Sequence, residues 1–296
     1  MRKVIDAFLY NGEVTVLDLR FQELDNSVDE FWIFEADYTF TGLSKELKFK
    51  NQLKSHAWPL EKIRYFPIQE SPGTISKDPW ENERFQRNFI GFQIHLCNSE
   101  DLIFLSDVDE IPRPEVIAQI RSNTHSEHFG IRMSTHYLKL NFQMIEPSVL
   151  AYSVCTVVFH KDHLTRYTAD QLRIGIREGS INSEIFESGG WHFSYLMDVQ
   201  QIQNKVRSFS HQEFNTPEFL NGIEIKTILK HRRDLFSREG FLWDFVSIDS
   251  LPRTVRENRR RYRHHLHKSN PFNLWVLFKN LTSLKRLMDP GRNHII

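Results

Sequence analysis

Apolar and polar positions fall into blocks along the chain that predict a mixed α/β protein. Apolar runs of strand length occupy residues 4–10, 29–34, 62–67 and 101–105, and apolar positions with helical spacing occupy 13–24. A strand–helix–strand opening of this kind is typical of α/β folds with a parallel sheet. We therefore expect the chain to open with a βαβ-like unit.

The clearest helical pattern covers residues 80–96. Phe85, Phe89 and Phe92 recur there at the spacing of one helix face, so we expect them on its buried side. Arg84 and Arg87 are expected on the other side. The pattern also predicts helices over 114–121 and 200–209, strands over 131–140 and 149–159, a polar irregular segment over 170–188, and mainly helices after residue 219.

Composition and charge are those of an ordinary globular protein. The 296 residues are 40% hydrophobic and 26% charged, and 24 of them are Phe, which predicts a large core rich in aromatic rings. Lys and Arg together number 38, as do Asp and Glu, so the formal net charge is zero. Binding of nucleic acid through the overall charge is therefore not expected.

The number of cysteines and the lack of long apolar runs indicate the cellular compartment. Cys97 and Cys155 are too few for a disulfide framework or a Cys-rich zinc site. Both lie in apolar runs, which favours packing thiols, with a single disulfide as the alternative. The first residues lack a signal-peptide pattern, and no run is long and apolar enough to span a bilayer. The sequence thus predicts a cytoplasmic protein.

The C-terminal part differs in charge from the rest. We expect a main domain over residues 1–250 and a basic helical extension over 251–296 that packs on it. Residues 253–268 are strongly basic, and 272–288 have the pattern of a cationic amphipathic helix. The favoured interpretation is a packing helix with solvated charges. The alternative is peripheral contact of the 253–288 segment with an anionic membrane or a lipid-linked substrate.

The stretch 101–113 carries the strongest candidate chemistry. Its apolar run indicates a buried strand, and Asp107, Asp109 and Glu110 follow directly before Pro112. Carboxylates in this position reach the edge of the sheet where open α/β folds bind ligands. The Asp-x-Asp spacing suits a hard cation, Mg²⁺ or Mn²⁺, that also holds phosphates. The alternative is a turn or a helix N-cap.

A second candidate stretch covers residues 189–195. Gly189 and Gly190 would let the backbone approach a ligand closely. Trp191 and Tyr195 offer flat faces that suit a sugar ring. His192 is a candidate for a further metal ligand, with a half-buried, hydrogen-bonded histidine as the structural alternative.

Several polar residues are candidates for binding a nucleotide. Arg84 and Arg87 could hold phosphates in bidentate geometry, and the alternative for them is a surface salt bridge. Lys205 and His211 are further cationic candidates beside a diphosphate. Glu35, at the end of the predicted strand 29–34, suits a hydrogen bond to a ribose or base, and the alternative is a turn or N-cap carboxylate.

Signature motifs of several other enzyme classes are missing from the sequence. It contains no G-x-G-x-x-G, P-loop, H-E-x-x-H or G-x-S-x-G pattern. The chemistry that the residues still favour is metal-assisted transfer on an activated phosphate ester, in which the cation stabilises a leaving diphosphate.

Further short segments follow one another in a specific order along the chain. After Asn11-x-Glu13 come LDLRFQEL at 17–24, VDEF at 28–31, EAD at 35–37, Thr39 with Gly42, LKF at 47–49, DVDEIP at 107–112, CTV at 155–157 and GWHFS at 190–194. Together they resemble the motifs of glycosyltransferase family 17. The chain has Thr15 where that family usually has Asp, and the likeness is loose over 160–187 and after 215.

The resemblance implies a fold and an activity. The expected fold is GT-A-like, a mixed, mainly parallel central sheet flanked by helices, with the helical extension at the C-terminus. The expected enzyme is an inverting N-acetylglucosaminyltransferase that moves GlcNAc from UDP-GlcNAc to a glycan hydroxyl in a β-linkage, β-1,4 in this family, with Mn²⁺ or Mg²⁺. No Golgi-type anchor is found, so a polysaccharide or lipid-linked oligosaccharide is the expected acceptor.

The implied activity gives the candidate residues their roles. The metal ligands would be Asp107, Asp109 and His192. The catalytic residues would be Asp109, Glu110 and Glu213, the last two as candidates for the general base. Donor binding is assigned to Asn11, Glu13, Glu35, Thr41, Gly42, Arg84, Arg87, Asp107, Gly190, Trp191, Lys205 and His211. The alternatives are another UDP-sugar as donor, a carbohydrate-binding protein without catalysis, and a metal-dependent phosphohydrolase.

Overall fold

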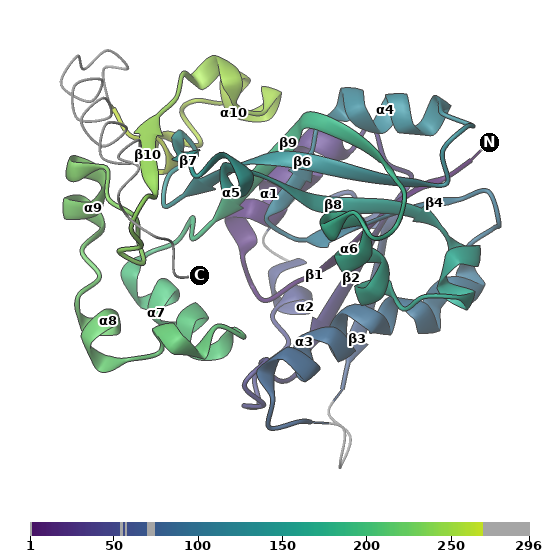
Figure 1. Cartoon of the computed structure of the whole chain (residues 1–296), viewed down its shortest axis with the longest axis horizontal. Helices are drawn as coiled ribbons and strands as arrows, with labels where there is room; N and C mark the ends of the chain where they lie inside the picture. The colour runs from purple at the N-terminus through teal and green to yellow at the C-terminus, as the bar shows by residue number, and fades with distance from the viewer. Residues whose placement is uncertain (1, 54–55, 57, 70–74, 269–296) are drawn as a thin grey trace, which may run out of the picture.

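The computed structural model of the chain describes residues 2–53, 56, 58–69 and 75–268. Within these residues a ten-stranded mixed sheet has the order β10-β7-β6-β8-β4-β1-β2-β3, with β9 paired to β6 and β5 to β9 (Figure 1). The strands are β1 (Val4–Leu9), β2 (Glu30–Ala36), β3 (Ile63–Ile68), β4 (Leu102–Asp107), β5 (Glu110–Pro112), β6 (His128–Tyr137), β7 (Phe142–Glu146), β8 (Tyr152–His160), β9 (Glu184–Ser194) and β10 (Leu242–Phe245).

Helices and shorter helical turns connect these strands. The α-helices are α1 (Val14–Leu24), α2 (Phe49–Gln52), α3 (Pro79–Asn88), α4 (Pro114–Ser122), α5 (Ser148–Ala151), α6 (Ala169–Glu178), α7 (Val199–Ser208), α8 (Pro217–Asn221), α9 (Ile225–His231) and α10 (Arg253–Glu257). The 3₁₀ turns are η2 (Leu60–Lys62), η3 (Phe89–Leu96), η4 (Lys161–Thr165), η5 (Gln212–Phe214), η6 (Ile248–Ser250) and η7 (Arg263–His265).

The direction of the strands decides where a ligand site can form. β1 pairs in parallel with both β2 and β4, and β2 with β3, so the predicted βαβ opening and the α/β class are confirmed. Beyond β4 the pairs β4–β8, β8–β6, β6–β7 and β7–β10 are antiparallel, and β6–β9 is parallel. The sheet is therefore mixed, and the expectation that it is mainly parallel is wrong for the described strands. Since Leu9 and Asp107 are register partners, the carboxyl ends of β1 and β4 meet at one edge of the sheet.

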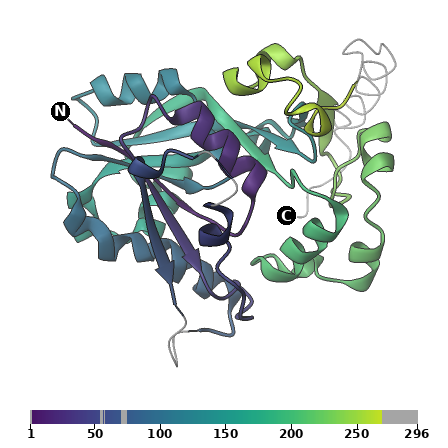
Figure 2. The same cartoon turned by 180° about the vertical axis from the view of Figure 1, so that it is seen from behind.

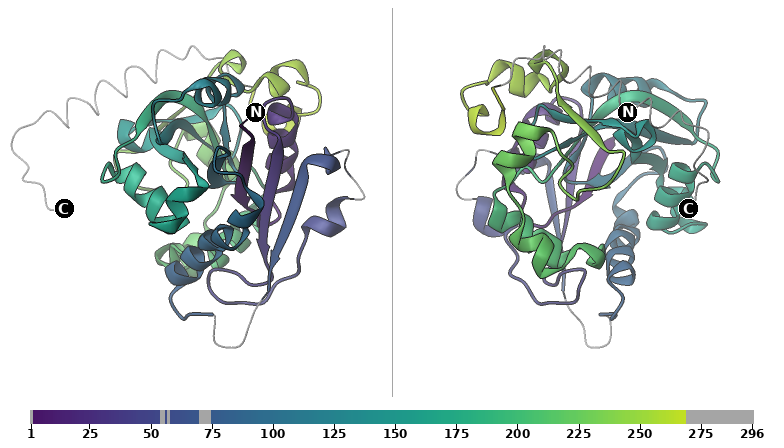
Figure 3. Two further views of the ribbon diagram at one scale, coloured as in Figure 1. Left: turned by 90° about the vertical axis from the view of Figure 1, so that its right-hand side faces the viewer. Right: turned by 60° about the vertical axis from the view of Figure 1, so that its left-hand side comes forward.

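Three apolar clusters hold the layers together. One packs α1, α4 and α10 on one face of the sheet, where Figure 2 shows α1 in purple in front of the strands. A second packs η3 and α6 on the other face. The third joins α7, α8 and α9 to β7 and β10 at one end of the sheet (Figure 1 and Figure 3). The site described below lies where these layers meet.

Two predictions about local structure are wrong. The helix expected over 80–96 stops at Asn88 and continues as η3, and Phe92 is exposed, whereas Asn82, Gln86 and Arg87 are buried. The polar side of α3 turns inward because it contacts other polar groups, among them the buried carboxylate of Asp170. The segment 170–188, expected to be irregular, forms most of α6 and the first part of β9.

The C-terminal residues that the structure describes pack on the main sheet. Leu251, Val255 and Tyr262 are buried in the same cluster as α1, while the arginines of this segment are exposed. The segment after residue 219 forms short helices together with β10, so it is less helical than predicted. Residues 269–296, and with them most of the expected 272–288 helix, lie outside the described residues. The domain boundary at 250 and the membrane contact therefore stay predictions.

Among the residues that the structure describes, no helix combines the length and the apolar character needed to cross a bilayer.

Candidate active site

A cavity of about 560 Å³ opens at the shared edge of β1 and β4. This volume is within the range of small-molecule binding sites. Its wall takes residues from the ends of both strands, from α3, α6, β9 and α7, and from the loop after α7. The predicted residues that line it are Asn11, Glu13, Arg84, Arg87, Asp107, Asp109, Glu110, His192, Lys205 and His211. The fold thus gathers most of the candidates from five separate parts of the sequence.

A buried arginine binds the backbone of the Asp-x-Asp turn. Arg20 of α1 is fully buried, and its Nε and Nη2 donate to both carboxylate oxygens of Asp6 at 2.7 and 2.5 Å. Its Nη1 donates at 3.0, 3.1 and 2.8 Å to the backbone oxygens of Asp107, Val108 and Glu110. These bonds fix the turn, because a guanidinium offers several donors in one rigid plane.

Glu110 and Asp107 share one cation, Arg173 of α6. The guanidinium donates to the two oxygens of Glu110 at 2.7 and 3.0 Å and to Asp107 Oδ2 at 3.0 Å. Burial alone would raise the pKa of both carboxyl groups, but the nearby cations together, with Arg173 the largest contributor among them, hold both pKa values below their usual range. A carboxylate bound on both oxygens and with a lowered pKa is a poor proton acceptor, which disfavours Glu110 as the general base.

Asp109 belongs to a second group of charges. Its Oδ2 lies 3.3 Å from Lys205 Nζ and its Oδ1 lies 3.6 Å from His192 Nε2. Lys205 also lies 3.4 Å from Glu13 Oε1, so α7 is tied to the loop before α1. Burial lowers the pKa of His192, but Asp109, Cys155 and Glu110 together outweigh this effect and raise the pKa to about 9. The Asp109 carboxylate is therefore shared between Lys205 and His192.

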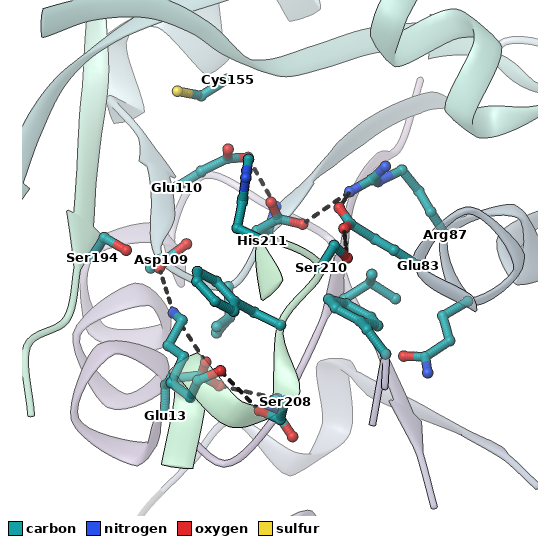
Figure 4. Close-up of a pocket in the computed structure, with 18 of the residues that line it drawn as sticks. Glu13, Glu83, Arg87, Asp109, Glu110, Cys155, Ser194, Ser208, Ser210 and His211 are labelled. Carbon is teal, nitrogen blue, oxygen red and sulfur yellow. Dashed lines mark hydrogen bonds and ion pairs between the residues drawn. The ribbon is translucent and has the colours of Figure 1, made fainter. Parts of the chain in front are cut away.

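Arg87 is the centre of a third group, on the α3 side of the cavity. It pairs with Glu83 at 2.6 Å and with Asp170, and it lies 3.9 Å from Asp107 Oδ1. Ser210 donates its hydroxyl to the other oxygen of Glu83 at 2.5 Å (Figure 4). Arg87 therefore forms ion pairs, as one interpretation predicts, and also faces the cavity, as the other does.

The donor set at the turn fits a divalent cation. Asp109 Oδ1 and His192 Nε2 are 3.6 Å apart, close to the roughly 3 Å between neighbouring ligands around Mg²⁺ or Mn²⁺. The side chain of Asp107 is 38% exposed and also lines the cavity. Two carboxylates and an imidazole suit these ions. This separation would let Asp109 and His192 share one ion.

Two predicted residues meet at the mouth of the cavity. His211 Nδ1 lies 2.8 Å from Glu213 Oε1, and His211 lines the cavity whereas Glu213 does not. The His211 ring also stands edge-on to Trp80 at a centroid distance of 4.7 Å. A carboxylate on Nδ1 orients the imidazole and leaves Nε2 for another partner.

Glu35 has a structural role in the described residues. It is fully buried, and its carboxylate accepts hydrogen bonds from the backbone N–H groups of Lys48 and Phe49 at 2.7 and 3.1 Å. The Tyr65 hydroxyl donates to it at 2.9 Å. Glu35 therefore holds the chain before α2, as the turn or N-cap alternative predicts, and it does not line the cavity.

Gly190 and Trp191 also serve the fold. A Cβ atom on Gly190 would lie 2.4 Å from the backbone oxygen of Ile111, so the glycine lets β9 approach β5. Trp191 is 2% exposed and donates its Nε1–H to the Ser250 backbone oxygen at 2.8 Å. Neither residue lines the cavity, nor do Thr41 and Gly42. Tyr195 does line it, as one of the two expected sugar-facing rings.

Sequence analysis missed the two arginines that organise the site. Arg20 lies within the LDLRFQEL segment but was not assigned a role in the site. An arginine on one apolar element and an aspartate, Asp6, on another indicate a buried ion pair. Arg173 lies in the segment that was expected to be irregular. Its helix has a capping box between Thr168 and Gln171, a signal that the sequence does contain.

Comparison with models of protein families gives a match over most of the chain. The family model described as glycosyltransferase family 17 matches residues 1–266. A human β-1,4-mannosyl-glycoprotein 4-β-N-acetylglucosaminyltransferase is 30% identical over 117 residues, and the rat enzyme of the same name matches equally well. This aligned stretch is 38% of the chain and 22% of the relative, so the match spans about a fifth of the relatives' length.

Similarity to solved structures is weaker. A 4-diphosphocytidyl-2C-methyl-D-erythritol synthase is 13% identical with a TM-score of 0.41 and covers 68% of this chain and 95% of its own. A Drosophila β-1,4-galactosyltransferase 7, solved with manganese, UDP-Gal and xylobiose, is 8% identical with a TM-score of 0.37 and covers 84% and 98%. The sequence match over residues 1–266 is the stronger finding.

Proposed function

The chain belongs to glycosyltransferase family 17, and from this premise we propose that it transfers a sugar from a nucleotide-sugar donor to a hydroxyl group of a glycan. The observation that carries the proposal is the cavity in which the Asp107–Glu110 turn meets Arg87, Arg173 and Lys205. A nucleotide diphosphate needs such a set of fixed cations, because the charge on its leaving phosphate grows during transfer.

We propose UDP-GlcNAc as the donor and inversion at the anomeric carbon with formation of a β-linkage, β-1,4 by analogy. The names of the 30%-identical relatives support the GlcNAc assignment, and the ordered motifs support the family mechanism. Asp109 and His192, with Asp107 beside them, would hold Mn²⁺ or Mg²⁺. When bound, the cation would neutralise charge on the diphosphate. Lys205 and Arg87 would contact the remaining phosphate oxygens.

Glu110 is proposed as a positioning residue and not as the base. It accepts the Asp107 backbone N–H at 2.9 Å and two bonds from Arg173, so it fixes both the turn and the guanidinium. We assign proton removal from the acceptor to His211, oriented by Glu213. In this step the acceptor oxygen bonds to the anomeric carbon, its proton passes to His211, and UDP leaves with the bonding electron pair.

A His211→Gln change is expected to lower the turnover number for UDP release from the donor about a hundredfold, with little change in UDP affinity, because general-base catalysis contributes about 10²–10⁴. Glu213→Gln should cost less, since the imidazole itself is retained. Initial rates and calorimetric UDP binding would measure the two effects. His231→Gln, at an exposed histidine of α9, is the matched control. Loss of UDP affinity with unchanged turnover would contradict the assignment.

The function itself is tested by a screen of UDP-sugars for UDP release, with and without Mn²⁺. We expect UDP-GlcNAc to be the preferred donor and Mn²⁺ to raise the rate. In calorimetry, Asp109→Asn should lower the Mn²⁺-dependent affinity for UDP at least tenfold, since a metal ligand is removed. Asp249→Asn, at an exposed aspartate, should not. Binding of glycans without binding or hydrolysis of any UDP-sugar would favour the carbohydrate-binding alternative instead.

A further inference from the structure

A cluster of metal-ligating side chains lies away from the cavity, at the other end of β6. His128 is the first residue of β6, whose last residue, Tyr137, lines the cavity. Ten extended residues separate these positions by about 30 Å. His163 lies in η4, directly after β8, which pairs with β6 so that His128 is opposite Phe159. Sheet pairing therefore brings the two histidines together.

The geometry of this cluster resembles that of a metal site. His128 Nε2 lies 3.0 Å from His163 Nδ1, and the ring planes are inclined by 59°. Two imidazole nitrogens on one tetrahedral zinc ion are separated by about 3.3 Å, given Zn–N bonds of about 2.0–2.1 Å. Glu127 is the third residue of this group, and one potential ligand atom from each of the three residues lies within 4.8 Å of the others.

The charge state of the two rings also suits a metal. Both histidines are half-buried, and burial lowers the pKa of each; His163 lowers the pKa of His128 further. Neutral imidazoles keep a lone pair for an ion, whereas protonated ones do not. Glu127 is exposed and can turn toward the ion at little cost.

We propose that Glu127, His128 and His163 form a second metal site, selective for zinc or a similar transition metal, separate from the cavity. Two imidazoles and a carboxylate are the protein ligands of many zinc ions, with a water in the fourth position. This donor set favours Zn²⁺ over Mg²⁺, which prefers oxygen ligands. The bound ion links the start of β6 to the turn after β8, so it stabilises this end of the sheet.

The test is zinc titration of the full, metal-stripped chain by calorimetry in a Mg²⁺ buffer, with thermal unfolding in parallel. Because Glu110, Cys155 and His192 in the cavity also bring ligand atoms within 4.8 Å of one another, the titration is repeated with His192→Gln. We expect one zinc equivalent to persist in His192→Gln. His163→Gln and His128→Gln should each weaken that equivalent at least tenfold and abolish the zinc-dependent rise in melting temperature.

His125→Gln is the matched control, since this exposed histidine lies two residues before Glu127 and outside the cluster. It should bind zinc as the unchanged chain does. The proposal is overturned if the zinc equivalent disappears in His192→Gln, which would assign it to the cavity. It is equally overturned if the equivalent persists in both His163→Gln and His128→Gln.

Discussion

An Arg20→Met protein is expected to have a free energy of unfolding about 3–5 kcal/mol below that of the unchanged chain. The change leaves Asp6, 1% exposed, as a buried charge without its cation. It also removes the donor that three backbone oxygens of the Asp-x-Asp turn share. Urea unfolding followed by circular dichroism would measure the difference. The activity should fall with it, because the turn carries Asp107 and Asp109.

A double change separates the ion pair from the turn. Asp6→Leu combined with Arg20→Met removes both charges, so it should recover much of the lost stability, as buried pairs replaced by apolar residues often do. It should not recover activity, since the turn still lacks its donor. Arg121→Met is the control, because its ion pair with Asp29 lies at the surface and should contribute less than about 1 kcal/mol. A cost below 1 kcal/mol for Arg20→Met would show that the buried pair does not hold the turn.

The parts of the fold that the sequence predicts well are those in which the local pattern and the burial agree. The strands at 4–10 and 101–105 are mainly apolar apart from Asp6 and Asp101, and they are buried on both faces, so their pattern has one interpretation. The first helix shows apolar positions on one face, and that face packs on the sheet. The position of Asp107 at the end of β4 follows from the run before it.

Prediction failed where polar residues face a buried site. Phe85 and Phe89 do pack against an apolar cluster, but the buried residues of α3 are Asn82, Gln86 and Arg87, which an apolar periodicity does not detect. The same holds for α6, where Arg173 is buried among its carboxylate partners. Which carboxylates they are depends on pairings across more than sixty residues, and no local pattern contains that information.

Residue type alone also misleads about ligand contact. Trp191 suits a sugar face and Glu35 a ribose, but the fold uses them for packing and for holding a backbone segment. Both belong to motifs of the family, and a motif can record either use. The structure separates the two uses because it shows which side chains reach the cavity.

Replacing Arg173 with Met is expected to lower the kcat/KM for UDP-GlcNAc about a thousandfold, roughly 4 kcal/mol in the transition state. The change leaves Glu110 and Asp107 without their shared cation, so two adjacent carboxylates would repel the diphosphate. The pKa of both groups should then rise, since Arg173 is the interaction that holds them low. Steady-state UDP release and calorimetric UDP binding would measure the loss, and urea unfolding would report whether the fold survives.

Arg173→Lys distinguishes charge from geometry at this position. An ammonium keeps the charge but cannot bind both oxygens of Glu110 and also reach Asp107, so we expect it to recover only part of the activity. Arg166→Met, at an exposed arginine before α6, is the matched control and should keep full activity. If Arg173→Met folded stably and released UDP at the rate of the unchanged chain, Arg173 would be excluded from the donor site. A Lys variant as active as the natural residue would show that charge suffices and that the bidentate geometry does not matter.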